Sequence, residues 1–198
     1  MRAKIAMAAS VCTLAVAALG VALATPASAD DSIPEDAKAA LSRLQETGSL
    51  SGADRATLLR YPEIAAHVVD PESGSLAPDD TVRLLAASGC HKADRYIAYK
   101  TLLGFKAFDW HSVVNYCWSS GKVSLKERYY YMANNDGTNY DMGLILNSQT
   151  GNGTATYYSR MQGKVENKFG DVAWTVKYPR IDYKVYGATG SYEITQTP

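Results

Sequence analysis

Hydrophobic and polar residues follow two different periods along this chain, and the change falls near Cys90. Between Ile33 and Ser88, apolar residues such as Ala37, Ala40 and Leu44 recur at three- and four-residue steps. This spacing is typical of amphipathic helices. Beyond Cys90, apolar and polar residues alternate in short runs, which is typical of strands with one buried face. The pattern therefore predicts a helical region followed by a β-rich region.

The helical region contains local start and stop signals. The expected helix starts are at Pro34, at Ser51 with Asp54, and at Pro78. Ser51 and Asp54 have the spacing of a capping box, in which the serine side chain binds the free N–H groups of the first turn. Gly48 should end the first helix, and Pro62 should break or restart the second.

The β-rich region contains eight runs of strand character separated by Gly, Asn and Pro turns. The expected strands are 95–101, 108–118, 123–132, 142–146, 154–161, 173–178, 181–186 and 192–195. No helical pattern lies between them, so neighbouring strands should pair antiparallel. The sequence predicts an α+β chain: a short N-terminal helical region followed by an antiparallel β-sandwich, either immunoglobulin-like or a small barrel.

The N-terminus has the features of an export signal. Arg2 and Lys4 precede an apolar run that ends at the small residues Ala27, Ser28 and Ala29. We therefore expect a signal peptide over 1–29, a helical region over 30–89, a β-sandwich over 90–198, and a secreted, extracellular protein. The alternative is an uncut N-terminal anchor. No later run is long enough to span a bilayer, so no membrane contact is expected after cleavage.

Two cysteines remain once the leader is removed, because Cys12 lies inside it. An oxidising exterior favours a disulfide between Cys90 and Cys117. In the chain-entropy account, a bridge closing a loop of this length stabilises the fold by about 3.5 kcal/mol.

Charge argues against polyanionic partners. The chain has 20 basic and 20 acidic residues, and loss of Arg2 and Lys4 with the leader would leave 18 basic residues against the same 20 acidic ones. Nucleic-acid binding draws on clustered Lys and Arg. We therefore expect no nucleic-acid partner.

Few groups in the sequence suggest catalysis. The three histidines are His67, His91 and His111. His111 lies two residues from Asp109, so both side chains should project from one face of a strand as an acid and its orienting partner. The alternative is that both are solvent-facing polar residues. No hydrolase elbow, zinc-binding helix or phosphate loop is present, and the sequence predicts no cofactor and no metal site.

Large aromatic side chains are the feature that most suggests recognition. The binding candidates are Trp110, Tyr116, Trp118, Tyr129 and Tyr131, and further aromatic candidates are Tyr157, Trp174 and Tyr183. Two outcomes are open for strand 108–118. If Val113 and Cys117 face the core, the aromatic residues form an exposed strip. If the aromatic face is the core, which ordinary strand packing favours, no strip exists.

A set of residues in the C-terminal half carries a resemblance. These residues are Leu102, Leu103, Gly104, Trp110, Tyr116, Cys117, Trp118, Gly121, Lys122, Val123, Tyr178, Pro179, Ile181 and Gly187. In these positions the chain resembles small secreted β-proteins of unknown function found in actinomycetes, and its Ala-rich leader is similar in style to theirs. The resemblance implies a secreted β-fold and assigns no activity, partner or functional residue.

Three classes of function remain open. The first is a non-catalytic binding module for cell-wall carbohydrate or a secreted or surface protein, acting through exposed aromatic residues. The second is a secreted inhibitor or toxin-like effector whose helical region is a pro-segment or docking arm, which should pack loosely or be clipped near Gly89 without unfolding the sheet. The third is an extracellular hydrolase with a deep pocket that holds converging carboxylates, or Asp109 with His111. The first is preferred, and enzymatic activity is not expected.

Overall fold

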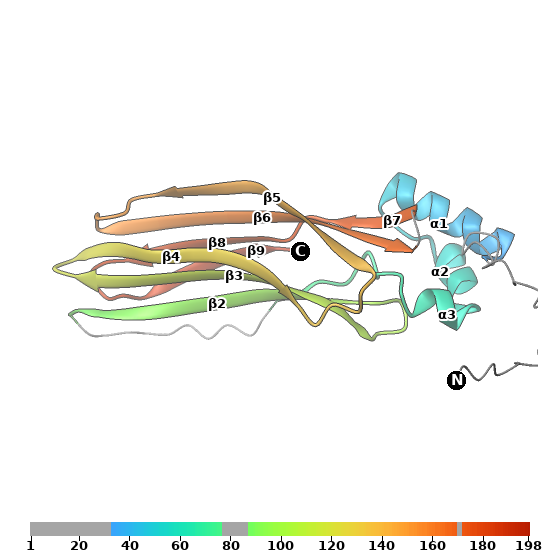
Figure 1. Cartoon of the computed structure of the whole chain (residues 1–198), viewed down its shortest axis with the longest axis horizontal. Coiled ribbons are helices and arrows are strands. Elements are labelled where there is room, and N and C mark those ends of the chain that lie inside the picture. The colour runs from blue at the N-terminus through green and yellow to red at the C-terminus, as the bar shows by residue number, and fades with distance from the viewer. Residues whose placement is uncertain (1–32, 77–86, 170–171) are drawn as a thin grey trace, which may run out of the picture.

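The computed structural model describes residues 33–76, 87–169 and 172–198. The predicted signal peptide over 1–29, the predicted helix start at Pro78 and the predicted turn at Gly170 lie outside these residues. The described elements form an elongated two-layer β-structure with three helices gathered at one end (Figure 1).

The helices begin and end where the local signals predicted. They are α1 (Glu35–Thr47), α2 (Gly52–Leu59) and α3 (Pro62–Ala65). Gly48 closes α1 in the left-handed conformation, with its N–H bound to the carbonyl of Leu44. The Ser51 side chain accepts a hydrogen bond from the Asp54 N–H at the start of α2, and Pro62 begins α3. None of these described helices has the length and apolar character needed to cross a bilayer.

The strands confirm the predicted β-sandwich. They are β1 (Ser75–Leu76), β2 (Gly89–Lys100), β3 (Lys106–Ser119), β4 (Lys122–Ala133), β5 (Asn139–Thr150), β6 (Thr156–Phe169), β7 (Val172–Lys177), β8 (Arg180–Tyr186) and β9 (Tyr192–Thr197). Each predicted strand overlaps one of β2 to β9, and most are longer than predicted. β1 was not predicted, because a two-residue strand leaves no alternating pattern.

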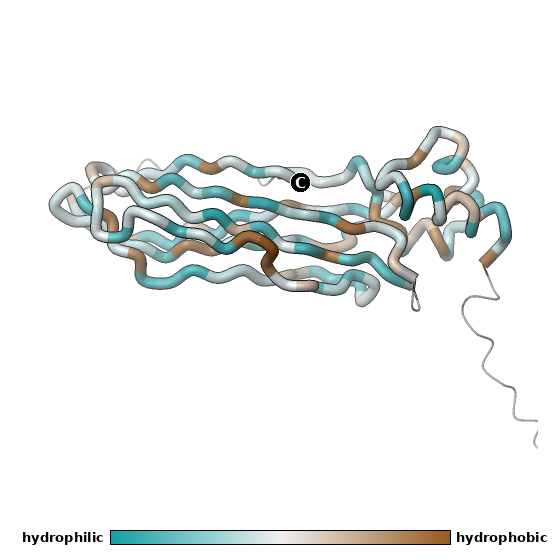
Figure 2. The backbone as a smooth tube through the Cα atoms, turned by 90° about the horizontal axis from the view of Figure 1, so that it is seen from above, coloured by the Kyte–Doolittle hydropathy of each residue, from teal (hydrophilic) through white to brown (hydrophobic). Residues whose placement is uncertain are grey.

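All strand pairs are antiparallel and form two sheets. The first sheet has the order β1-β2-β3-β4, and the second has the order β5-β6-β8-β9, with β7 paired to the end of β6. Figure 2 shows hydrophilic and hydrophobic residues alternating along the long strands, as expected when one face of each sheet is buried. Buried residues alternate with more exposed ones most regularly in β2 and β8.

Glycines of the second sheet and its loops make room for the two large tryptophans of β3. A Cβ atom added to Gly163 would lie 2.5 Å from Nε1 of Trp110, and one added to Gly190 would lie 2.2 Å from the Trp118 ring. Trp110 is fully buried and Trp118 is 3% exposed. The indole rings thus fill space that any larger residue at these glycines would occupy.

The helical region packs onto the end of the second sheet. Leu44 of α1, Leu58 of α2 and Val68 after α3 share a buried cluster with Leu102 and with Trp174 of β7. Backbone bonds join the two regions as well, because the Leu102 N–H binds the carbonyl of Val68 and the Asp70 N–H binds the carbonyl of Lys100. The helical region and the sandwich therefore share apolar packing and an isolated antiparallel bridge between Val69 and Thr101.

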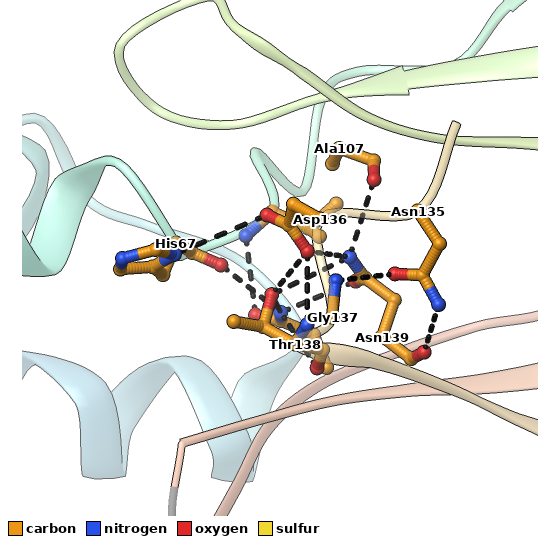
Figure 3. A network of polar contacts seen from close by, with 9 residues as sticks. His67, Ala107, Asn135, Asp136, Gly137, Thr138 and Asn139 are labelled. Atoms are coloured by element: carbon orange, nitrogen blue, oxygen red, sulfur yellow. Dashed lines mark hydrogen bonds and ion pairs between the residues drawn. The ribbon is translucent and has the colours of Figure 1, made fainter.

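A buried polar network fixes the same junction (Figure 3). Asn167 of β6 is 2% exposed. Its side chain accepts a hydrogen bond from the Val69 N–H and donates to the carbonyl of His67. It also donates to the Asn139 side chain, which in turn donates to Asp136. Removing one partner would leave buried polar groups unpaired. The expectation that the helical region packs loosely is therefore wrong, whereas cleavage near Gly89 without unfolding of the sheet stays a prediction.

The predicted disulfide joins Cys90 of β2 to Cys117 of β3. The two residues are direct partners in the antiparallel register, with their Cα atoms 3.9 Å apart and a sequence separation of 27. Cys90 is the second residue of β2 and Cys117 lies two residues before the end of β3, and these ends of the two strands lie away from the helices (Figure 1). The bridge therefore ties the first pair of long strands at the end that the helices do not stabilise.

Replacing both bridge cysteines with alanine should lower the free energy of unfolding by about 3.5 kcal/mol, because the unfolded chain regains the entropy of the open loop. Denaturant unfolding of the double variant, beside the parent protein with and without reductant, measures the change. Equal midpoints for the oxidised parent protein and the double variant would contradict a stabilising bridge.

The Gly163→Ala substitution should destabilise the sandwich by roughly 1–3 kcal/mol, because the new methyl group overpacks against Trp110. Gly104→Ala is the control for the contact with Trp110. A Cβ at Gly104 meets no atom within 4 Å, so this variant carries only the strain of a positive φ. Thermal unfolding followed by tryptophan fluorescence measures the loss of stability. The emission of the folded protein should be shifted in Gly163→Ala and should equal that of the parent protein in Gly104→Ala. An unshifted emission in Gly163→Ala would argue against this contact.

Candidate functional site

Three of the predicted binding residues lie in the core. Trp110 and Tyr116 are fully buried, and Trp118 is 3% exposed. The Tyr116 hydroxyl donates a hydrogen bond to the carbonyl of Gly190 across the sandwich. The aromatic face of β3 is therefore the core face, and the exposed strip proposed for these three residues does not exist. The further candidates Tyr157, Trp174 and Tyr183 are buried too.

Tyr129 and Tyr131 do lie on the outer face of the first sheet, within a dense polar and aromatic cluster. We call this the histidine cluster; its residues are Lys92, Asp94, Tyr96, His111, Tyr129 and Tyr131. The His111 ring stacks between Tyr96 and Tyr131, with ring centroids 4.9 and 4.3 Å away. Cross-strand register produces this stack, because His111 faces Tyr96 on one side and Tyr131 on the other.

Asp94 holds the histidine cluster together. One carboxylate oxygen lies 2.8 Å from Nδ1 of His111, and the other accepts the hydroxyl of Tyr131 at 2.9 Å. Desolvation, followed by the hydrogen bond to Asp94, raises the pKa of Tyr131 to about 12. The Lys92 ammonium lies 5.6 Å from the centre of the Tyr129 ring. Both faces of His111 and one face of Tyr131 are thus covered by neighbours in the cluster, which leaves little ring surface for a ligand.

The proposed pairing of Asp109 with His111 is wrong. Asp109 is 3% exposed, and its carboxylate accepts hydrogen bonds from Lys106 and Asn134. The carboxylate partner of His111 is Asp94, on the neighbouring strand. Within the described residues, His111 makes no hydrogen bond to a serine, threonine or cysteine side chain. The histidine pair therefore lacks a positioned nucleophile. No cluster of three or more potential metal-ligating His, Cys, Asp or Glu side chains occurs in this described part.

The outer face of the second sheet carries two adjoining grooves, with volumes of about 240 and 190 Å³. Both are lined by Tyr158 and Arg160 of β6. The first extends to Ser148 and Thr150 of β5. The second extends over β8 and β9, and its further lining residues are Asp182, Tyr183, Lys184, Glu193 and Thr195. We call the two together the Tyr158 groove.

Strand register explains the composition of the Tyr158 groove. One row across the sheet runs Thr150, Tyr158, Lys184, Glu193, and the next runs Ser148, Arg160, Asp182, Thr195. Four neighbouring strands span about 14 Å between the first and the last. The groove thus crosses the strands and presents hydroxyl, carboxylate, ammonium and guanidinium groups beside a tyrosine ring that is 38% exposed.

Several of these groups are held in place by contacts within the protein. Arg180 donates two hydrogen bonds to the carboxylate of Asp182, and Lys184 lies 3.9 Å from Glu193. The Tyr157 hydroxyl, reaching from the core side, donates to the Gln149 side chain. The groove is therefore largely preformed, which lowers the entropy cost of binding.

The sequence pattern did not identify Tyr158 and Arg160 as site residues. Strand 154–161 was predicted, but the adjacent Tyr157 was the aromatic residue singled out. Alternation shows that Tyr157 and Tyr158 face opposite ways without showing which one is buried. A usable signal was the neighbouring arginine: an aromatic residue two positions from Arg160 shares its face, and arginine is rarely buried.

The Asp94→Asn substitution should lower the pKa of Tyr131 from about 12 toward the ordinary value of about 10, because the negative charge that disfavours tyrosinate is removed. Ultraviolet titration of tyrosinate absorbance measures this, and Tyr131→Phe identifies the affected group. In the parent protein, Tyr131 ionises near pH 10 when the chain is unfolded and near pH 12 when it is folded. The stability that protonated Tyr131 contributes to the fold is therefore lost as pH rises from about 10 to 12. An identical titration curve for Asp94→Asn would disprove the role of Asp94.

Comparison with known proteins does not identify the chain: no family model, curated protein or solved structure matches it. The resemblance to small secreted actinomycete β-proteins stays a prediction. Any function must therefore be argued from the geometry of the molecule itself.

Proposed function

We propose that this protein is an exported, non-catalytic binding module that holds a carbohydrate chain in the Tyr158 groove. The observation that carries the proposal is the pair of adjoining grooves that share one exposed tyrosine and one exposed arginine. Export rests on the predicted leader, and the predicted disulfide pair supports it because such bridges persist in oxidising compartments.

The chemistry of the Tyr158 groove suits a sugar chain. The lining side chains of Ser148, Thr150 and Thr195 can both donate and accept hydrogen bonds. A sugar ring presents hydroxyl groups around its rim and C–H groups on its faces. Tyr158 provides an apolar ring for such a face, with a polar tip. The polar character of the lining favours this ligand over a purely apolar one.

Two features favour binding over hydrolysis. The groove is open, so it gives little of the desolvation that strengthens electrostatic catalysis in a closed site. Of its two acids, Asp182 is engaged, since both its oxygens accept hydrogen bonds from Arg180, whereas the Glu193 side chain is 66% exposed. A glycosidase needs a pair of carboxyl groups that act together, and the groove offers one that is not already bound.

Tyr158→Ala should weaken polysaccharide binding by roughly tenfold, which corresponds to about 1.4 kcal/mol. Tyr131→Ala is a matched control, because Tyr131 is 37% exposed on the opposite outer face, against 38% for Tyr158. Binding to a panel of neutral and charged polysaccharides would be measured by depletion from solution and by calorimetry, with thermal unfolding to check that both variants fold.

We expect Tyr131→Ala to bind as the parent protein does. If only Tyr131→Ala loses binding, the histidine cluster is the ligand site instead. If no polysaccharide binds the parent protein, or if Tyr158→Ala binds unchanged, the proposal is wrong.

A further inference from the structure

Arg160 stands out among the charged residues of the Tyr158 groove. It is exposed and contributes to both grooves. The other cations near it are engaged, because Arg180 binds Asp182 and Lys184 lies beside Glu193. Within residues 33–76, 87–169 and 172–198, Arg160 has neither an ion-pair partner nor a hydrogen-bond partner for its guanidinium group.

The strand register shows why Arg160 lacks a partner among the described residues. Its direct neighbour on β8 is Asp182, the acid that would be expected to neutralise it. Arg180 occupies that acid instead, with donor–acceptor distances of 3.0 and 2.6 Å. The five N–H donors of Arg160 therefore remain available in the groove. On its other side lies Ser148 of β5, whose hydroxyl can donate to the same ligand.

We propose that the carbohydrate held in the Tyr158 groove is anionic, and that a carboxylate or phosphate group on the sugar chain binds the Arg160 guanidinium. The inference rests on the proposed function and names its ligand class. A guanidinium group forms two parallel hydrogen bonds to such an oxyanion, which adds geometric selectivity to the charge attraction. Tyr158, two residues along the same face, would contact the adjoining sugar ring.

The balance of charge in the protein makes the attraction local. The chain has equal numbers of basic and acidic residues, so a broad positive field does not draw polyanions to its surface. Selectivity for an acidic sugar must then come from one site. This distinguishes the proposal from general polyanion binding, which draws on many spread cations and would be insensitive to a single substitution.

The test compares Arg160→Gln with Lys164→Gln in the full chain. Lys164 lies on the same strand and the same outer face, is paired with Glu166, and does not line the groove. Both variants lose one positive charge. The probes are polygalacturonate, its fully methyl-esterified form, and a glycosylated poly(glycerol phosphate). Calorimetry at low and moderate salt gives the affinities, and thermal unfolding confirms folding.

We expect the parent protein to prefer polygalacturonate over its methyl ester or to prefer the phosphate polymer; the stronger acidic probe shows which oxyanion is used. Arg160→Gln should weaken binding of that probe at least tenfold, whereas Lys164→Gln should bind like the parent protein. Arg160→Lys keeps the charge but loses the forked geometry, so intermediate binding is expected.

Two results would overturn the inference: equal losses in Arg160→Gln and Lys164→Gln, or binding of the methyl ester as tight as that of the acid. In the second case the protein still binds carbohydrate, so the proposed function stands. Absence of binding to all three probes and to the neutral panel would instead remove the proposed function itself. The two failures are therefore distinguishable.

Discussion

The arrangement of the whole sandwich depends on burial of the aromatic face of β3. Trp110 and Trp118 need more space between the sheets than an ordinary strand residue leaves, and Gly163 and Gly190 provide it. Once these rings are buried, the two-residue period of the strand fixes which face of the sheet each remaining side chain of β3 occupies. His111 must lie outside. Every outer position on the paired strands then follows from the register.

The same constraint explains how far the sequence could predict the structure. Local patterns were enough for the helix limits at Gly48 and Pro62, for the long strands and for the Cys90–Cys117 bridge. They could not decide which face of strand 108–118 is buried, because both faces carry apolar residues. The aromatic face is buried because Gly163, more than fifty residues from Trp110 in the sequence, leaves room for the indole ring. No pattern within one strand contains that information.

The helical region illustrates a related gap. Its helices were predicted from caps and spacing, but its attachment to the sandwich was not. The contacts that fix it, such as the Asn167 side chain bound to His67 and Val69, join residues about a hundred positions apart. A polar residue in a strand normally indicates the outer face. Asn167 is instead buried because the backbone groups of an incoming segment satisfy its amide.

The two outer faces differ in how their polar groups are used, and this difference is why we place the proposed ligand on the second sheet. In the histidine cluster, Asp94 already accepts from His111 and Tyr131, and the rings cover one another. A ligand at the histidine cluster would have to displace hydrogen bonds and ring contacts within the protein that are as favourable as the new contacts it could form. In the Tyr158 groove the strand register brings an extra cation beside an acid that is already occupied. We expect an oxyanion with two matched acceptors to compete favourably with solvent for the exposed Arg160 guanidinium. The number of polar and aromatic residues on a face therefore says less about its capacity to bind a ligand than the presence of one exposed charged group, here Arg160, that has no partner of opposite charge among the described residues.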